Sequence, residues 1–207
     1  MAFYAIDGLV PVADPTAYVH PSAVVIGDVH LGADCYVGPN ASLRADVGRI
    51  TVLAGSNIQD CCVVHCFPGE ETLLEAGSNI GHGAVLHGCR IGAGALVGMN
   101  AVVMDGAHVG AGALVAATSF VSAGFVVPPR TLVAGSPARV VRELDDAALA
   151  WRETGGDEYV ELARRSRATM TEVESLPQPE PGRRRFEGGA GSSVPLHAFR
   201  THDHPPG

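Results

Sequence analysis

The sequence is poor in aromatic and in basic residues. Aromatic side chains make up 5% of the 207 residues although hydrophobic residues make up 46%, so a core must be filled mainly by Val, Ile, Leu and Ala. The formal net charge is −8, with 14 Lys and Arg against 22 Asp and Glu. Nucleic acids and anionic membranes bind concentrated basic surfaces. We therefore expect neither as a partner of this chain.

Signals for secretion and for membrane insertion are also missing. The N-terminus lacks the basic and then apolar pattern of a secretory signal, and the five cysteines are an odd number without a disulfide spacing. These features predict a reducing, cytoplasmic location, with the cysteines as small buried residues. Residues 109–129 contain no ionisable side chain. Their glycines and six-residue period differ from a membrane-spanning helix, so we expect no such helix.

A six-residue period dominates the sequence instead. Aliphatic residues recur every six positions, and a small residue follows many of them four positions later. Neither the 3.6-residue period of a helix nor the two-residue period of a strand gives this pattern. A chain that turns a corner every six residues does, and three such faces make one turn of a parallel β-helix whose aliphatic side chains stack. The aliphatic positions are Val19, Val25, Leu31, Val37 and Leu43, and then Ile91, Val97, Val103, Val109, Val115, Val121 and Val127.

Changes of pattern at Gly135-Ser136-Pro137 and at Pro177 divide the chain into three parts. Residues 1–136 carry the period and are predicted to form the β-helix. Residues 137–176 predict two helices that pack along the coil, the first starting near Leu144 and closed by Gly155-Gly156, the second running from about Asp157 to Leu176. Residues 177–207 are rich in Pro, Gly, Arg and Ser, so we expect disorder. The predicted fold class is mainly β with C-terminal α-helices.

The repeat is least regular between Arg44 and Arg90. Ile80 and Ile91 are eleven residues apart where two repeats need twelve, and residues 67–71 predict a surface loop. Local rules tend to break where a protein houses its function. The candidate functional residues all lie in this section.

Three histidines of the irregular section predict a metal site. His82 and His87 lie five residues apart among glycines, and His65 lies about one structural repeat earlier. Three neutral imidazole nitrogens with one open position are the ligand set of a catalytic zinc. A single histidine would more often be structural, but three at this spacing favour a metal ion.

Polar residues accompany these histidines. Asn57 and Gln59 alternate with Ile58, so their amides share one face of a strand while Ile58 faces the core. They precede His65 closely enough to orient a ligand histidine or a bound water. The remaining polar candidates are Arg44, Asp46 and Asp60.

These motifs resemble the gamma-class carbonic anhydrase family of hexapeptide-repeat proteins, over about residues 8–176. Within that family the chain looks most like the branch of phenylacetic acid degradation proteins, and the carnitine-operon branch is nearly as similar. The resemblance rests on Ser42-Leu43-Arg44-Ala45-Asp46, Asn57-Ile58-Gln59-Asp60, Val64-His65, Gly81-His82-Gly83-Ala84-Val85-Leu86-His87-Gly88-Cys89 and the stretch from Leu96 to Gly106.

The resemblance implies a left-handed coil and a homotrimer with a metal ion at the subunit interfaces. The metal would be Zn²⁺, with Fe²⁺ or Co²⁺ as alternatives. His65 and His87 would come from one chain and His82 from its neighbour.

The resemblance also implies roles for the polar candidates. Gln59 would hold the metal-bound water. An ion-pair network between subunits would be made by Arg44, Asp46 and Asp60.

Two acidic residues that the carbonic anhydrases of the family use for proton transfer are replaced here by Val47 and Pro68, although Glu70 or Glu71 could serve instead. We therefore rank hydrolysis of an acyl-CoA thioester, linked in the family to phenylacetate degradation, above hydration of carbon dioxide. A hexapeptide acyltransferase is a further alternative, but it typically needs one catalytic histidine and no metal triad. A structural scaffold is the last.

Overall fold

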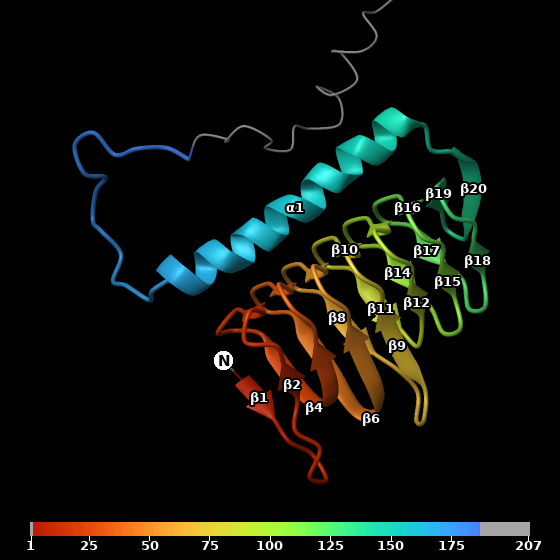
Figure 1. The fold of residues 1–207 in the computed structure, drawn as a ribbon, viewed down its shortest axis with the longest axis horizontal. Helices are drawn as coiled ribbons and strands as arrows, with labels where there is room; N and C mark the ends of the chain where they lie inside the picture. Colours follow the sequence, from red (N-terminus) through yellow and green to blue (C-terminus); the bar gives the residue numbers. More distant parts are fainter. Residues whose placement is uncertain (1, 187–207) are drawn as a thin grey trace, which may run out of the picture.

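The chain winds into a coil of short parallel strands with one helix along its side (Figure 1). The structure is a computed structural model, and it describes residues 2–186. Successive strands lie on successive faces, and each strand pairs with those one turn before and after it. The predicted fold, a mainly β parallel β-helix, is confirmed, and it is consistent with the left-handed form.

Two of the three faces share strands that continue round a corner. β4 (Val24–Leu31) and β6 (Ser42–Val52) each begin on the first face and end on the second. The first face also holds β1 (Ala2–Tyr4), β8 (Val63–His65), β11 (Val85–His87), β14 (Val102–Val103) and β17 (Phe120–Val121). The second face holds β2 (Val12–Ala13), β9 (Glu71–Leu74), β12 (Arg90–Ile91), β15 (His108–Val109) and β18 (Val126–Val127).

The third face is a sheet of its own and ends in a hairpin. Its parallel strands are β3 (Tyr18–Val19), β5 (Tyr36–Val37), β7 (Asn57–Ile58), β10 (Asn79–Ile80), β13 (Leu96–Val97) and β16 (Leu114–Val115). β19 (Thr131–Gly135) continues the sheet, and β20 (Ala138–Glu143) pairs with it antiparallel. The strand β20 occupies residues 138–143, ahead of the helix start predicted near Leu144.

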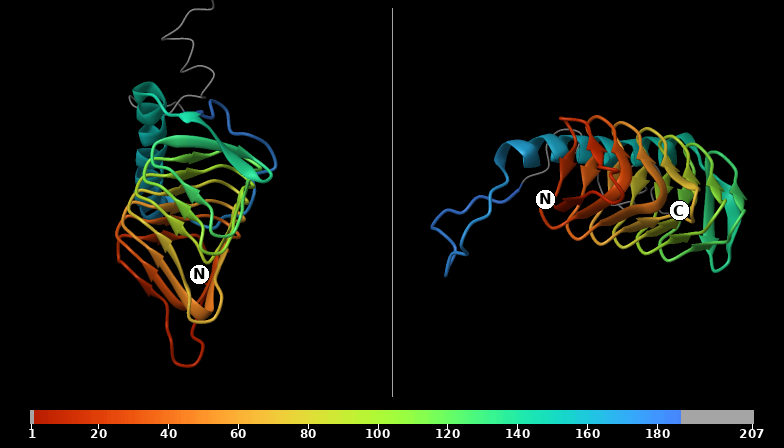
Figure 2. Two further views of the ribbon diagram at one scale, coloured as in Figure 1. Left: turned by 90° about the vertical axis from the view of Figure 1, so that its right-hand side faces the viewer. Right: turned by 90° about the horizontal axis from the view of Figure 1, so that it is seen from below.

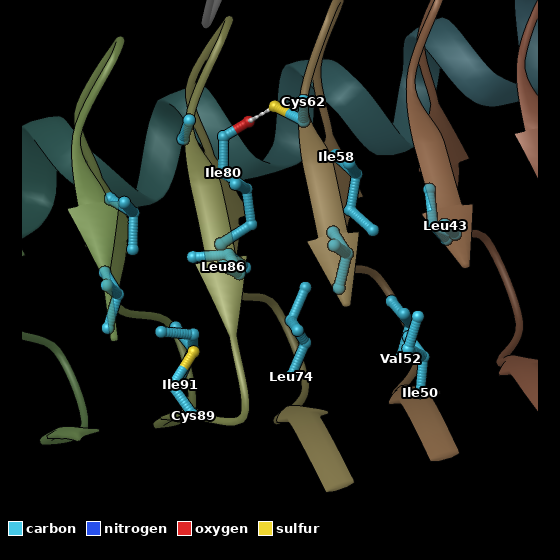
Figure 3. Close-up of a cluster of buried hydrophobic side chains, with 14 of the residues drawn as sticks. Leu43, Ile50, Val52, Ile58, Cys62, Leu74, Ile80, Leu86, Cys89 and Ile91 are labelled. Carbon is cyan, nitrogen blue, oxygen red and sulfur yellow. Dashed lines mark hydrogen bonds between the residues drawn. The ribbon is translucent and has the colours of Figure 1, made fainter. Parts of the chain in front are cut away.

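The core is the stack of aliphatic side chains that the six-residue period predicts. Every aliphatic position named above is buried, and the seven from Ile91 to Val127 have no exposed surface. Register places Leu86 of β11 between Val64 of β8 and Val103 of β14. Figure 3 shows this stacking for neighbouring turns. Each such side chain contributes roughly 1.5–3 kcal/mol, and no turn can bury its own without its neighbours.

All but one of the five cysteines are buried in the protein. Four are buried as predicted, whereas Cys61 is exposed at a corner with φ of 61°. The Cys62 thiol donates to the carbonyl oxygen of Gly81 at 3.2 Å, and burial raises its pKa to about 11. A reactive thiolate is therefore disfavoured at Cys62.

One long helix, α1 (Asp146–Thr169), replaces the two predicted helices. Asp145 caps its start by accepting a hydrogen bond from the Ala148 backbone N–H at 2.8 Å. The predicted break at Gly155-Gly156 is wrong, as is the predicted end at Leu176, because the helix runs through both glycines and ends at Thr169. A glycine inside a helix costs about 1 kcal/mol relative to alanine, a cost that tertiary packing commonly overrides.

That packing joins α1 to the third face. The helix runs back along the coil over β3, β5 and β7 (Figures 1 and 2). The ring of Tyr159 lies 5.3 Å from that of Tyr36, which stacks on Tyr18 at 5.5 Å, and Ala163 is fully buried beside them. The Arg164 side chain adds an ion pair to Asp34 at 3.0 Å.

The remaining described residues contain no further regular element. Residues 177–186 form neither helix nor strand, and residues 187–207 of the predicted tail lie outside the described residues, so its disorder stays a prediction. Within residues 2–186, α1 lacks the apolar stretch that a membrane-crossing helix requires.

Val127→Asp tests the buried stack, with Val126→Asp as a matched control. Val127 is fully buried, whereas the adjacent Val126 is 61% exposed. An unpaired buried carboxylate should lower the free energy of unfolding by about 3 kcal/mol or more, while the exposed one should change it by less than about 0.5 kcal/mol. Urea unfolding followed by circular dichroism measures both. Equal unfolding midpoints for the two variants would contradict the stacked core.

Candidate functional site

Two of the predicted metal ligands lie side by side on the first face. His65 and His87 end the neighbouring strands β8 and β11 and are register partners, so their side chains leave the same side of the sheet. Nδ1 of His65 lies 3.1 Å from Nε2 of His87. Both side chains are mostly sheltered, with 17% and 24% of their surfaces exposed.

A carboxylate holds the outer nitrogen of His87. Oδ1 of Asp105 lies 2.5 Å from Nδ1 of His87. The corner next to His87 is turned by Gly88, which lies within the shortened interval from Ile80 to Ile91 and has φ of 53°. A Cβ at Gly88 would lie 2.6 Å from Asp105 Oδ1. A carboxylate on Nδ1 fixes the imidazole and leaves Nε2 free to act as a ligand. Sequence reasoning missed Asp105. The turn after β11 is 17 residues long, since Leu86 pairs with Val103, and the place of Asp105 beside His87 follows only from that register.

A second carboxylate holds His65. Asp46 Oδ1 lies 3.1 Å from His65 Nε2, and Arg44 Nη1 donates to both oxygens of Asp46 at 2.9 and 2.7 Å. The hydrogen bond from Arg44 keeps the pKa of Asp46 below its ordinary value. The aspartate therefore remains a carboxylate that can accept a hydrogen bond from the imidazole. Arg44 and Asp46 thus pair within one chain, and their predicted role between subunits stays a prediction.

His82 belongs to a separate group. It lies in the turn between β10 and β11, its Nδ1 is 2.7 Å from Asp60 Oδ2, and 46% of its side chain is exposed. Oε1 of Gln59 accepts a hydrogen bond from the His82 backbone N–H at 3.2 Å, and Gln59 Nε2 donates to Asn57 Oδ1 at 3.1 Å. Asn57 and Gln59 share one face, as predicted. Both are buried, on a face along which α1 packs, instead of meeting water.

One chain therefore brings together His65 and His87 but not His82. Among residues 2–186, no group of three or more His, Cys, Asp or Glu side chains is arranged to hold a metal ion within a single chain. The candidates form two groups. The first comprises Arg44, Asp46, His65, His87 and Asp105, and the second comprises Asn57, Gln59, Asp60 and His82.

The first group fits two ligands of a zinc ion. Two nitrogens on one tetrahedral zinc lie about 3.3 Å apart, given Zn–N distances of about 2.0–2.1 Å. The observed separation of 3.1 Å between the His65 and His87 nitrogens is close to that value. Each of the three histidines also faces one carboxylate, which is the usual outer partner of a metal-bound imidazole.

A pocket of about 490 Å³ adjoins the first group, because Asp46 lines it. It lies between the corner of β6 and the loop that precedes β9. The chain between β8 and β9 forms no strand, which confirms the predicted loop. Leu9 and Val47 give it half-exposed apolar walls, and Glu70 lines it without a side-chain hydrogen bond or ion pair to any described residue. Phe67 of the same loop places its ring edge-on to His87, with centroids 4.9 Å apart.

Comparisons with known proteins show relatives that match most of the chain, although no protein-family model matches it. The carnitine operon protein CaiE of Citrobacter koseri is 53% identical over 188 residues, which cover 91% of this chain and 95% of that protein. CaiE of Salmonella typhimurium is 51% identical over the same shares.

Solved structures of hexapeptide-repeat relatives also match most of the chain. A hexapeptide transferase family protein from Anaplasma phagocytophilum is 34% identical, with a TM-score of 0.76 over 79% of this chain and 96% of that one. A candidate acetyltransferase from Bacillus cereus is 33% identical, with a TM-score of 0.80 over 81% and 97%.

Asp105→Asn tests the outer partner of His87. The amide lacks the negative charge of the carboxylate, so it should hold the imidazole less firmly and weaken Zn²⁺ binding about 10–100-fold. Competition with a chromogenic chelator measures the affinity. Asp34→Asn is the control, because it makes the same change in the ion pair to Arg164 and should leave Zn²⁺ affinity unchanged. Equal affinities for the two variants would remove Asp105 from the site.

Proposed function

The chain belongs to the family of hexapeptide-repeat proteins that includes the carnitine operon protein CaiE, and from that premise we propose that it is a metal-dependent hydrolase of acyl-CoA thioesters. We further propose that the active form is a homotrimer in which neighbouring chains complete each site. The separation of the three histidines into two groups is the observation that carries this proposal.

The two groups suit a contact between copies of the chain. His82 is the most exposed of the three histidines, so it is available to a neighbour. Beside His65 and His87, register aligns an outward apolar row along the first face, made by Val63, Val85, Val102 and Phe120. Val63 and Phe120 at its ends are 43% and 36% exposed. Exposed apolar rows often mark interfaces, and a contact between two different surfaces can close into a ring.

The residues of both groups then have distinct tasks. His65 and His87 would hold Zn²⁺, Fe²⁺ or Co²⁺ together with the neighbour's copy of His82. A divalent ion would supply such a site with a hydroxide-like nucleophile at neutral pH. Asp46 and Asp105 keep the imidazoles of the first group oriented. Gln59 Oε1 is the acceptor next to His82 that would orient the attacking water.

Thioester hydrolysis needs room for an acyl group, which would lie in the pocket beside Asp46. Water adds its oxygen to the carbonyl carbon, the C–S bond breaks, and the thiolate takes up the proton that the water releases. A pocket of about 490 Å³ exceeds what carbon dioxide requires, and Leu9 and Val47 give it apolar surface beside a charged lining that includes Asp28, Arg49 and Glu70. The sequence motifs of this chain resemble those of the phenylacetic acid degradation protein PaaY. Phenylacetyl-CoA and related thioesters are therefore the first substrates to test. Such substrates agree with the proposed cytoplasmic location.

Two other reactions have support of their own. Carbon dioxide hydration uses the same three histidines, and we keep it as the first alternative. The transferase names of the solved relatives favour acyl transfer as the second. A purely structural scaffold has less support, because three histidines with three carboxylate partners are more than a scaffold needs.

Mixing inactive variants tests the two-chain site. His65→Ala and His82→Ala should each abolish metal binding and hydrolysis. Trimers assembled from equal amounts of the two should regain roughly a quarter of the sites, since a site is intact whenever an unmodified first group meets an unmodified His82. Co-expression with two tags, followed by zinc analysis and thioesterase assay, measures the recovery.

The control mixes His65→Ala with His87→Ala. These residues belong to one group, so no combination of the two chains restores a site. Recovery in this control, or none in the first mixture, would refute the division of the site between chains.

Val47→Glu distinguishes hydrolysis of thioesters from hydration of carbon dioxide. Glutamate restores an acid where the family's carbonic anhydrases have one, so it should raise carbon dioxide hydration more than thioester turnover. It also places a charge in the proposed acyl pocket, which should raise KM for apolar thioesters. Stopped-flow hydration and a thiol-release assay measure the two reactions. Our ranking would be reversed if the wild type hydrates carbon dioxide with kcat/KM near the diffusional ceiling of ~10⁸ M⁻¹s⁻¹ and hydrolyses no thioester.

A further inference from the structure

Three amide side chains are buried together next to His82. Gln59 lies between Asn57 of β7 and Asn79 of β10, which are register partners on the third face. Their exposed fractions are 7%, 0% and 6%. Gln59 Nε2 donates to Asn57 Oδ1 at 3.1 Å and to Asn79 Oδ1 at 2.8 Å.

These contacts leave the Gln59 amide one orientation. The His82 backbone N–H can only donate, so the atom facing it must be Oε1. Nε2 has two hydrogens, and the two asparagine oxygens accept both of them. Turning the amide by 180° would set N–H against N–H at His82 and oxygen against oxygen at both asparagines. Three hydrogen bonds would become three repulsive contacts.

This orientation of the Gln59 amide leaves a buried donor of Asn57 unpaired. Its Nδ2 is buried and has no hydrogen-bond partner among the described residues. Turning the Asn57 amide instead would bring its donor against the donor of Gln59. Most buried donors in proteins are paired, so an unpaired one calls for an explanation. Holding Gln59 in a single orientation explains it.

We propose that Asn79 is a positioning residue, which acts with Asn57 to keep Gln59 Oε1 toward His82. The proposal rests on the proposed function and makes it more specific. Because both Nε2 hydrogens of Gln59 are engaged, Gln59 can accept a hydrogen bond from the attacking water through Oε1 but cannot donate one to it. Sequence reasoning did not single out Asn79, and its role follows from the register with Asn57.

The first test is made on the metal-free protein and needs no activity. Side-chain ¹⁵N NMR follows exchange of the Gln59 amide hydrogens with solvent. Asn79→Leu removes the acceptor at similar size and should speed exchange of one hydrogen at least tenfold. Asn79→Asp keeps an acceptor oxygen and should retain slow exchange, and Asn79→Ala replaces the leucine variant if that one does not fold. Equal exchange rates in the wild type and in the variant without the acceptor would overturn the proposal.

The second test is a double-mutant cycle with Gln59→Ala. Asn79→Leu should lower kcat about tenfold with KM little changed, and it should have no further effect once Gln59 is alanine. The same loss in both backgrounds would mean a merely structural role and would overturn the proposal. If the wild type hydrolyses no thioester, the proposed function fails, and the exchange measurement alone then decides the role of Asn79.

Discussion

Parallel register is the constraint on which the rest of this structure depends. Each turn of the coil lies on the previous one, so residues one turn apart share a column. In the core this register stacks Val64, Leu86 and Val103 into a continuous ladder. On the outward side of the strands the same geometry stacks His65 on His87, and it stacks Asn57 on Asn79, which are buried. Scaffold and candidate site therefore result from one repeat, and a shift in register would disrupt both.

The same geometry separates the histidines. Outward side chains of different faces point in different directions, so His82, which lies in the turn after the third face, does not join the pair on the first face. Carboxylates accompany both groups, with Asp46 and Asp105 on one and Asp60 on the other. The proposed homotrimer would bring these two groups together.

Periodicity in the sequence was sufficient to predict the coil, its buried positions and the loop near Phe67, because burial in this fold repeats locally. It was not sufficient for α1, where contacts of Tyr159 and Ala163 with the coil outweigh the two helix-breaking glycines. Asp105 and Asn79 were missed for a related reason. Each acts on a residue about one turn away, so its role is visible only when register is known.

Anomalous X-ray diffraction at the zinc edge, from crystals of the zinc-loaded protein, tests the central claim most directly. The account predicts one zinc peak per chain, within about 2.1 Å of nitrogens from His65 and His87 of one protomer and from His82 of another. A peak ligated by a single chain, or a well-ordered protein in which these histidines bind no zinc, would contradict it.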